Sequence, residues 1–353
     1  MTKSIFNIFN YASTICIMYV ASTDIAQAAD KTAVAAQPNT QMQSVLDELT
    51  KLGPKPLDTL NAVDARKQPS PADAVKALLK KKGKSLDPEA VGNVENKMIA
   101  GTGGQIPIRI YTPIGEGPFS VIVYYHGGGW VIADLDTYDA SPRALVNATQ
   151  AVVVSAHYRQ APEHKFPAAH EDAFAAYKWV LEHIKELKGD PKRIAIVGES
   201  AGGNMAAAVS VMARDQKMQI PVHQVLVYPI ADDNLETVSY VENAKAAPLS
   251  RPAMQWFFKQ YLNLPADGKN HLISLLSEKN LKGLPPTTII TAQIDPLRSE
   301  GKAYADLLQK AGVKVRYQNY EGVTHEFFGM AAVIDKAKEA QQFVAQGLKE
   351  SFK

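Results

Sequence analysis

Apolar and polar positions along the chain follow two periodicities. Short runs of consecutive apolar residues, typical of strands buried on both faces, recur from residue 106 almost to the end. Between several of these runs, apolar residues return at helical spacing, as in the segment 170–187, whose apolar side chains share one face. This alternation predicts an α/β fold, with a mostly parallel central sheet flanked by helices. The strands that we predict are 106–111, 121–125, 151–155, 194–197, 225–228, 288–292 and 313–317.

Two regions depart from this alternation. Helical periodicity at 42–49 and 72–79 precedes the first predicted strand and has no partner in the strand–helix repeat. The segment 232–274 lies between two predicted strands and contains a helix rich in aromatic residues, a pattern that in isolation is more typical of a core helix. Long insertions of this kind often form lids.

We therefore predict a helical cap in two parts. Its N-terminal part covers residues 41–93, and the insertion 232–274 forms the rest. The segments 94–231 and 275–353 together make up the α/β domain that the cap covers. The chain of 353 residues then forms one large domain with a lid rather than several independent domains.

Composition narrows the class of function. The chain is 46% hydrophobic and 21% charged, which is typical of a globular protein, and its formal net charge is +2. A charge so close to zero gives no reason to expect a nucleic-acid partner. The sequence shows no metal-ligand cluster and no dinucleotide-binding glycine fingerprint.

The N-terminus has the pattern of a secretory signal peptide over residues 1–28. Lys3 supplies a short charged region, 5–20 is mostly apolar, and 26–28 is an Ala-x-Ala site, which predicts cleavage after Ala28. An uncleaved N-terminal anchor is the alternative. The prediction implies a periplasmic or secreted protein without stable membrane insertion after the signal is removed.

The predicted mature chain contains no cysteine. Cys16 is the only cysteine and would leave with the signal, so a cysteine nucleophile and a cysteine metal site are both excluded. Residues 29–40 are mostly Ala, Gln, Thr and Pro, a composition that predicts a disordered leader.

The pentapeptide Gly198-Glu199-Ser200-Ala201-Gly202 carries the strongest chemical signal. It lies between the predicted strand 194–197 and a predicted helix at 204–209. A serine in such a turn has the layout of a nucleophile elbow, whose glycines allow the tight turn and whose hydroxyl is exposed near the helix N-terminus. The alternative is an ordinary glycine-rich turn, which the flanking strand and helix disfavour.

A second motif, His126-Gly127-Gly128-Gly129, directly follows the predicted strand 121–125. Adjacent glycines let backbone N–H groups point into a cavity, as an oxyanion hole requires. A flexible linker is the alternative, but a linker is not expected between two apolar runs. The two motifs in this order are far more specific than either one alone.

At these residues the sequence resembles the hormone-sensitive-lipase branch of the α/β-hydrolases, which are mostly bacterial carboxylesterases. Matching segments lie at 126–139, 158–173, 198–204, 294–301 and 322–329, with weaker similarity from about Val94 to the end. The resemblance implies a helical cap, no cofactor and a small-molecule ester substrate, and it is compatible with a homodimer.

The resemblance also implies roles for particular residues. The triad would be Ser200, Asp295 and His325, and the motifs around it would include His126, Gly127, Gly198, Glu199 and Gly202. The oxyanion hole would be formed by N–H groups of Gly128, Gly129 and Ala201, although sequence alone leaves open which two of the three adjacent glycines donate.

The chain departs from the family pattern at four positions. Glu199 stands where Asp is usual, Ala133 where Gly is, Tyr138 where His is, and Glu326 where Gly is frequent. None of these changes removes a catalytic group. We therefore expect Glu199 and Glu326 to alter the charge of the site and its substrate preference.

Chemical reasoning supports the same three triad residues. The order Ser200, Asp295, His325 is the one expected of α/β-hydrolases, and the acid and the base each follow a strand-like run. A serine hydroxyl needs a base to remove its proton, and a histidine held by a carboxylate can do so near neutral pH.

Rival residues exist for two of these roles. His126 could serve as the base, and Asp232 or Asp233 could serve as the acid after the strand 225–228. The position of His126 suits the loop that follows its strand, and Asp295 has the better context at a strand end.

The sequence thus predicts a serine carboxylesterase that hydrolyses short- to medium-chain esters through an acyl-enzyme. An amidase or β-lactam hydrolase with the same triad remains an alternative. A non-catalytic ligand-binding protein on the same scaffold is a third hypothesis, which the presence of His325 disfavours.

Overall fold

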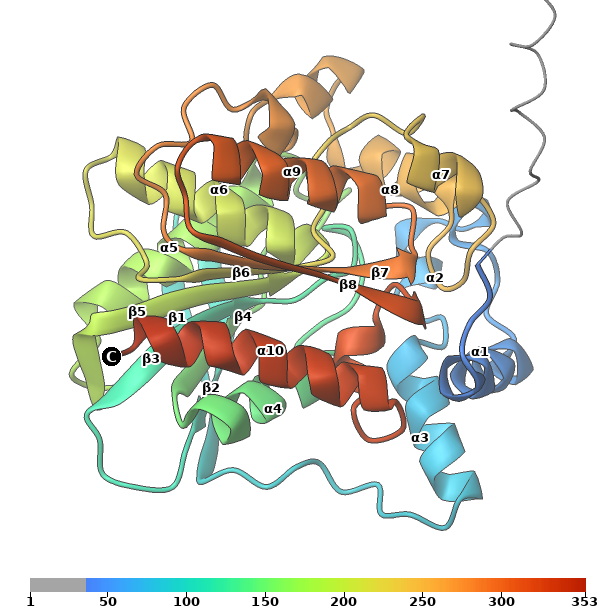
Figure 1. The fold of residues 1–353 in the computed structure, drawn as a ribbon, viewed down its shortest axis with the longest axis horizontal. Coiled ribbons are helices and arrows are strands. Elements are labelled where there is room, and N and C mark those ends of the chain that lie inside the picture. The colour runs from blue at the N-terminus through green and yellow to red at the C-terminus, as the bar shows by residue number, and fades with distance from the viewer. Residues whose placement is uncertain (1–35) are drawn as a thin grey trace, which may run out of the picture. The chain divides into compact units, whose positions relative to one another are not determined.

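The computed structural model describes residues 36–353 (Figure 1). The predicted signal peptide, and residues 29–35 of the predicted leader, lie outside the described residues. Described residues form a single eight-stranded sheet in the order β1-β2-β4-β3-β5-β6-β7-β8. The strands are β1 (Asn93–Gly101), β2 (Gly104–Thr112), β3 (Phe119–Tyr125), β4 (Val152–Ala156), β5 (Gly189–Glu199), β6 (Gln224–Val227), β7 (Thr287–Ile294) and β8 (Val315–Thr324).

The sheet is parallel from β4 to β8, which confirms the predicted mostly parallel architecture. The strand β2 pairs antiparallel with both β1 and β4, and every other pairing is parallel. All residues of β3 after the first are buried, because its apolar run is covered by helices on both faces. The carboxyl ends of the parallel strands therefore meet along one edge of the sheet, where loops can converge.

Helices cover both faces of the sheet (Figure 1). One face packs on α5 (Ala168–Glu182), α6 (Ala201–Asp215) and α9 (Arg298–Lys310), and the other on α4 (Ala140–Thr149) and α10 (Asp335–Ser351). Alternate residues of β3 enter the two cores: Val121 and Val123 lie in the cluster with α5 and α6, whereas Ile122 lies in the cluster with α4 and α10.

The two segments that we assign to the cap contain the remaining α-helices of the described chain. The first holds α1 (Thr40–Leu52), α2 (Ala62–Ala65) and α3 (Pro71–Lys81), and the second holds α7 (Val238–Glu242) and α8 (Arg251–Tyr261). The short 3₁₀ helices are η1 (Leu57–Thr59), η2 (Pro265–Lys269), η3 (Leu275–Ser277) and η4 (Phe327–Met330). Among residues 36–353, no helix has the length and apolar character needed to span a membrane.

A hydrogen bond joins the two cap segments. The indole Nε1 of Trp256, on α8, donates to the carbonyl of Leu60, beside η1, over 2.9 Å. Helices α1 and α3 pack against each other, and both begin at side-chain caps, Asn39 and Ser70. The helical periodicity at 42–49 and 72–79 is thus confirmed, while the boundaries of the cap stay a prediction.

Candidate active site

Ser200 lies in a tight turn between β5 and α6. Its backbone has φ 57° and ψ −119°, a strained conformation for a residue with a side chain, and its N–H donates to the carbonyl of Val227 over 2.9 Å. A Cβ atom on Gly202 would lie 2.0 Å from the carbonyl oxygen of Tyr125, so only glycine fits there. The close approach of β3 and the first turn of α6 thus requires glycine at position 202.

The structure brings Asp295 and His325 to this serine. The Nε2 atom of His325 lies 2.9 Å from Ser200 Oγ, and its Nδ1 atom lies 2.7 Å from Asp295 Oδ2. Asp295 directly follows β7, and its other oxygen accepts the N–H of Leu297 over 2.9 Å. Exposed fractions are 4% for Ser200, 3% for His325 and 0% for Asp295. This is the geometry in which an imidazole can take the serine proton while a buried carboxylate fixes its tautomer.

The pKa of His325 reflects opposing influences. Burial lowers this pKa, but the contact with Asp295, together with the carboxyls of Glu326 and Glu199, outweighs burial and raises it above its ordinary value. The charged form of His325 is therefore favoured at this position, chiefly by its contact with Asp295.

Three backbone N–H groups near Ser200 are free to bind an oxyanion. Those of Gly128, Gly129 and Ala201 have no hydrogen-bond partner within residues 36–353. Gly128 has φ 98° and Gly129 has φ 56°, values that L-residues rarely adopt, so the glycines permit this loop geometry. Ala201 opens α6, whose first N–H groups have no acceptor inside the helix.

Rival residues for base and acid lie elsewhere. His126 is buried beside His157, with their Nε2 and Nδ1 atoms 3.1 Å apart, and burial lowers the pKa of His126 to about 3. Asp232 accepts the hydroxyl of Ser274, and Asp233 accepts the ammonium of Lys269. The structure therefore does not bring any of the three to the serine.

Glu199 is a buried carboxyl that is hydrogen-bonded to two tyrosine hydroxyls rather than to the serine hydroxyl. It accepts the hydroxyls of Tyr124 over 2.6 Å and Tyr228 over 2.5 Å, and only 1% of it is exposed. Burial raises the pKa of Glu199 to about 7, against the opposing effect of these hydrogen bonds. Glu199 thus connects Tyr124, near the end of β3, to Tyr228, which directly follows β6.

Two of the departures noted in the sequence contact each other. The Tyr138 hydroxyl donates to Glu326 Oε1 over 2.5 Å, across a separation of 188 residues. Glu326 Oε1 also lies 4.0 Å from His325 Nε2. The sequence identified each position separately, but it held no signal that the two side chains form a pair.

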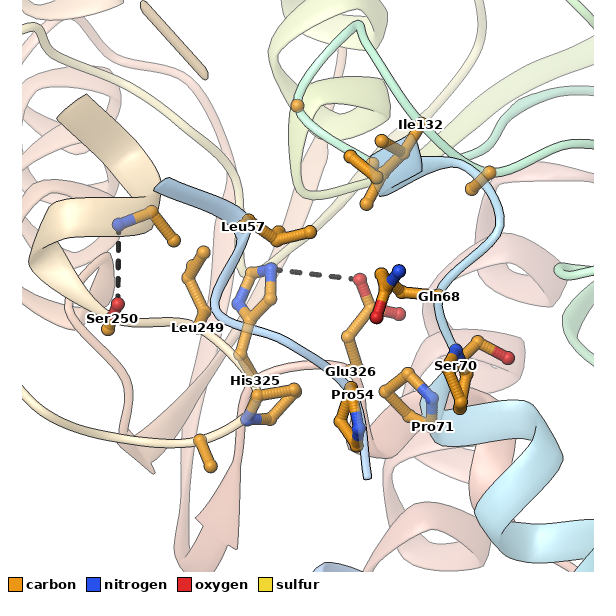
Figure 2. A pocket seen from close by; sticks show the side chains of 18 of the residues that line it. Pro54, Leu57, Gln68, Ser70, Pro71, Ile132, Leu249, Ser250, His325 and Glu326 are labelled. Carbon is orange, nitrogen blue, oxygen red and sulfur yellow. Dashed lines mark hydrogen bonds and ion pairs between the residues drawn. The ribbon is translucent and has the colours of Figure 1, made fainter. Parts of the chain in front are cut away.

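Ser200 and His325 are among the residues that line a cavity of about 590 Å³. Figure 2 shows this cavity with His325 and Glu326 on its wall. Its walls come from the loop at 128–138, from residues 54–73 and from residues 246–257. The volume is in the range of pockets for small organic ligands. Within the described chain, no group of His, Cys, Asp and Glu side chains is arranged to hold a metal ion.

Comparisons with known proteins agree with this architecture. A family model for the alpha/beta hydrolase fold matches residues 122–329. The chain is 44% identical to the carboxylesterase NlhH of Mycobacterium tuberculosis over 67% of this chain and 75% of that protein. It is 31% identical to an ethyl acetate hydrolase of Pseudomonas putida, over 84% and 92% of the two chains. A hyperthermophilic esterase from the archaeon Pyrobaculum calidifontis superposes with a TM-score of 0.81 at 36% identity, covering 89% of this chain and 98% of that one.

Proposed function

The chain belongs to the hormone-sensitive-lipase-like carboxylesterases of the alpha/beta hydrolases, and we propose that its ester hydrolysis runs through Ser200, His325 and Asp295. The observation that carries this proposal is the continuous hydrogen-bond chain from Ser200 Oγ through both nitrogens of His325 to Asp295. All three side chains are at least 96% buried, so water competes little for these bonds.

Acylation comes first in the proposed mechanism. Ser200 Oγ attacks the ester carbonyl carbon while His325 Nε2 takes the hydroxyl proton. The carbonyl oxygen becomes an oxyanion, which accepts hydrogen bonds from the free N–H groups of Gly128, Gly129 and Ala201. The tetrahedral intermediate then collapses, the bond to the alcohol oxygen breaks, and His325 gives its proton to the leaving alcohol.

Deacylation repeats these steps with water. His325 takes a proton from a water molecule, whose oxygen attacks the acyl carbon on Ser200. The second tetrahedral intermediate expels Ser200 Oγ, which regains its proton from His325, and the carboxylic acid leaves. Asp295 keeps its charge throughout and stabilises the imidazolium in both halves of the reaction.

Short to medium acyl chains, of about two to eight carbons, are the proposed substrates, because a cavity of about 590 Å³ limits ligand size. The ring of Phe257 packs against Gly129 in the wall of the cavity. A Cβ atom on residue 129 would lie only 2.2 Å from this ring. The similarity to an enzyme named for ethyl acetate hydrolysis also favours a small substrate.

A series of p-nitrophenyl esters from acetate to palmitate tests this proposal. We expect hydrolysis to peak at short chains and to disappear in Ser200→Ala, which keeps the backbone of the elbow. Wild-type rates in Ser200→Ala contradict the mechanism, and a peak at palmitate contradicts the proposed substrate class.

We also propose that the enzyme acts in the periplasm or outside the cell. Support comes from the charged, apolar and Ala-x-Ala regions of residues 1–28. N-terminal sequencing of exported protein is expected to begin at Ala29. A mature protein that starts at Met1 contradicts the proposed cleavage.

A further inference from the structure

Glu326 occupies a backbone conformation that costs free energy. Its φ is 70°, in the left-handed region that favours glycine. A side chain held there at such a cost is a candidate for a functional contact. Glu326 immediately follows His325, so any function of its carboxylate would act at the triad.

The carboxylate of Glu326 points into the cavity beside His325 (Figure 2). One oxygen, Oε1, accepts the Tyr138 hydroxyl over 2.5 Å and lies 4.0 Å from His325 Nε2. The other oxygen has no hydrogen-bond partner among residues 36–353. The Glu326 side chain is 22% exposed and lines the cavity, so a ligand in the cavity can contact its carboxylate.

Other charged side chains that line the cavity are engaged elsewhere or lie exposed on the cap. Arg66 binds both oxygens of Glu163 and two backbone carbonyls. Asp73 accepts the N–H and hydroxyl of Ser70 at the start of α3. The three remaining charged residues of the lining are exposed, namely Lys55, Asp58 and Lys67. Glu326 is thus the charged lining side chain that lies against the triad.

Proton transfer fixes where the alcohol half of a substrate lies. In the proposed mechanism, His325 Nε2 gives its proton to the leaving oxygen, so that oxygen must come within hydrogen-bond distance of Nε2. Since Glu326 Oε1 lies 4.0 Å from the same nitrogen, the first atoms of the alcohol pass the carboxylate. A cation placed two or three bonds beyond the ester oxygen can reach it.

We propose that Glu326 forms an anionic subsite for the alcohol half of the substrate, which makes the enzyme prefer esters of amino alcohols over neutral esters of the same shape. This inference rests on the proposed function, because it uses His325 as the proton donor to the alcohol. The Tyr138 hydroxyl holds the carboxylate in place, so the pair of unusual residues acts as one unit.

Two acetate esters of matched shape test the subsite. One is 2-(trimethylammonio)ethyl acetate, and the other is its uncharged carbon analogue, 3,3-dimethylbutyl acetate. Because burial raises the pKa of Glu326, kcat/KM is measured at about pH 8.5 to keep the carboxylate ionised. We expect the wild type to prefer the cationic ester by about tenfold and Glu326→Gln to lose that preference.

Matched variants isolate the charge of this carboxylate. Glu326→Gln keeps an oxygen for the Tyr138 hydroxyl, and Glu326→Gly removes the side chain while relaxing the backbone at φ 70°. Glu321→Gln removes an exposed charge five residues away and is expected to keep the preference. The ratio of the two substrates on one enzyme also cancels any change in the basicity of His325.

The outcomes separate the subsite from the proposed function. A wild type that hydrolyses both acetates equally well overturns the subsite, as does a preference that persists in both Glu326 variants. Hydrolysis of p-nitrophenyl acetate is measured alongside. A wild type inactive on all three esters contradicts the proposed function itself, whereas activity on p-nitrophenyl acetate without preference contradicts the subsite alone.

Discussion

The ends of the central strands and the cap hold their side chains in different ways. Ser200, Asp295 and His325 follow β5, β7 and β8, and each is at least 96% buried and hydrogen-bonded. Residues 54–70 of the cap form one wall of the same cavity, yet only Ala62 and Ala65 among them are buried. The strand ends therefore hold these three side chains in buried, hydrogen-bonded positions, while residues 54–70 contribute a more exposed wall.

This contrast suggests that the strand ends determine the rate of the chemical step, whereas the cap determines which substrates bind. Substitutions at the strand ends should lower kcat, because transition-state contacts need precise geometry. Substitutions in the cap should change KM and substrate preference while kcat stays close to its wild-type value. Glu326 lies between the two regions, since it follows β8 but faces residues of the cap (Figure 2).

Asp295→Asn should have the largest effect. An amide at this position favours the wrong imidazole tautomer, so we expect kcat to fall about 10⁴-fold with little change in KM. Steady-state kinetics on p-nitrophenyl butyrate measures this. Asp232→Asn is the matched control, because Asp232 also follows a strand but bonds Ser274. A comparable loss in the control contradicts the assignment of Asp295.

Gly129→Ala should have the next largest effect. An alanine here would have to adopt φ 56°, and its Cβ atom would lie 2.2 Å from the Phe257 ring. The backbone N–H of residue 129 would therefore move from its position, and we expect kcat to fall by about 10²- to 10³-fold. The double variant Gly129→Ala/Phe257→Ala removes the overlap with the ring but keeps a side chain at φ 56°, so it should remain slow. Recovery of wild-type kcat in the double variant indicates that the loss came from crowding alone.

Glu199→Gln should change stability in a pH-dependent way. The carboxyl of Glu199 has a pKa of about 7 in the folded protein, above its ordinary value of 4.5, so its stabilising contribution is complete below pH 4.5 and is lost as pH rises through 7. A glutamine does not ionise. We therefore expect the variant to match the wild type near pH 4.5 and to exceed it by roughly 3 kcal/mol at about pH 8.

Urea unfolding at several pH values measures this difference. Glu321→Gln, which removes an exposed carboxyl, serves as the control and should follow the wild type. If wild type and Glu199→Gln show the same change in unfolding free energy with pH, then burial does not shift the titration of Glu199.

Trp256→Phe should have the smallest effect, and we expect that effect on substrate binding rather than on kcat. The change removes the hydrogen bond to the Leu60 carbonyl that joins the two cap segments, which is worth about 1 kcal/mol. We expect KM for p-nitrophenyl butyrate to rise up to about fivefold while kcat is preserved. A loss in kcat of more than tenfold would show that the cap also controls the chemical step.

Much of the fold could be predicted because buried parallel strands have continuous apolar runs. The runs at 121–125 and 288–292 fall within β3 and β7. The sequence pattern gives no sign of β1, since Ile99 is its only buried residue and no apolar alternation marks it. The predicted strand 313–317 begins later, at Val315, and continues to Thr324, because an edge strand tolerates polar residues.

The site could be predicted where motifs follow parallel strands. Ser200, Asp295 and His325 could be expected to converge because the carboxyl ends of such strands share one edge. The sequence assigns residues 54–70 to the cap, but it does not predict their path along the cavity, since they have no periodicity and are positioned by tertiary contacts such as that of Arg66 with Glu163. The pairing of Tyr138 with Glu326 likewise depends on the folded loops.

Covalent labelling tests the central claim most directly. The wild type is treated with a fluorophosphonate, which reacts with activated serines, and intact mass and peptide mapping locate the adduct. The account predicts one adduct per chain, on Ser200, with loss of esterase activity in proportion to labelling and no adduct in Ser200→Ala. An adduct on another residue, or full activity in the fully labelled enzyme, would contradict the role assigned to the strand ends.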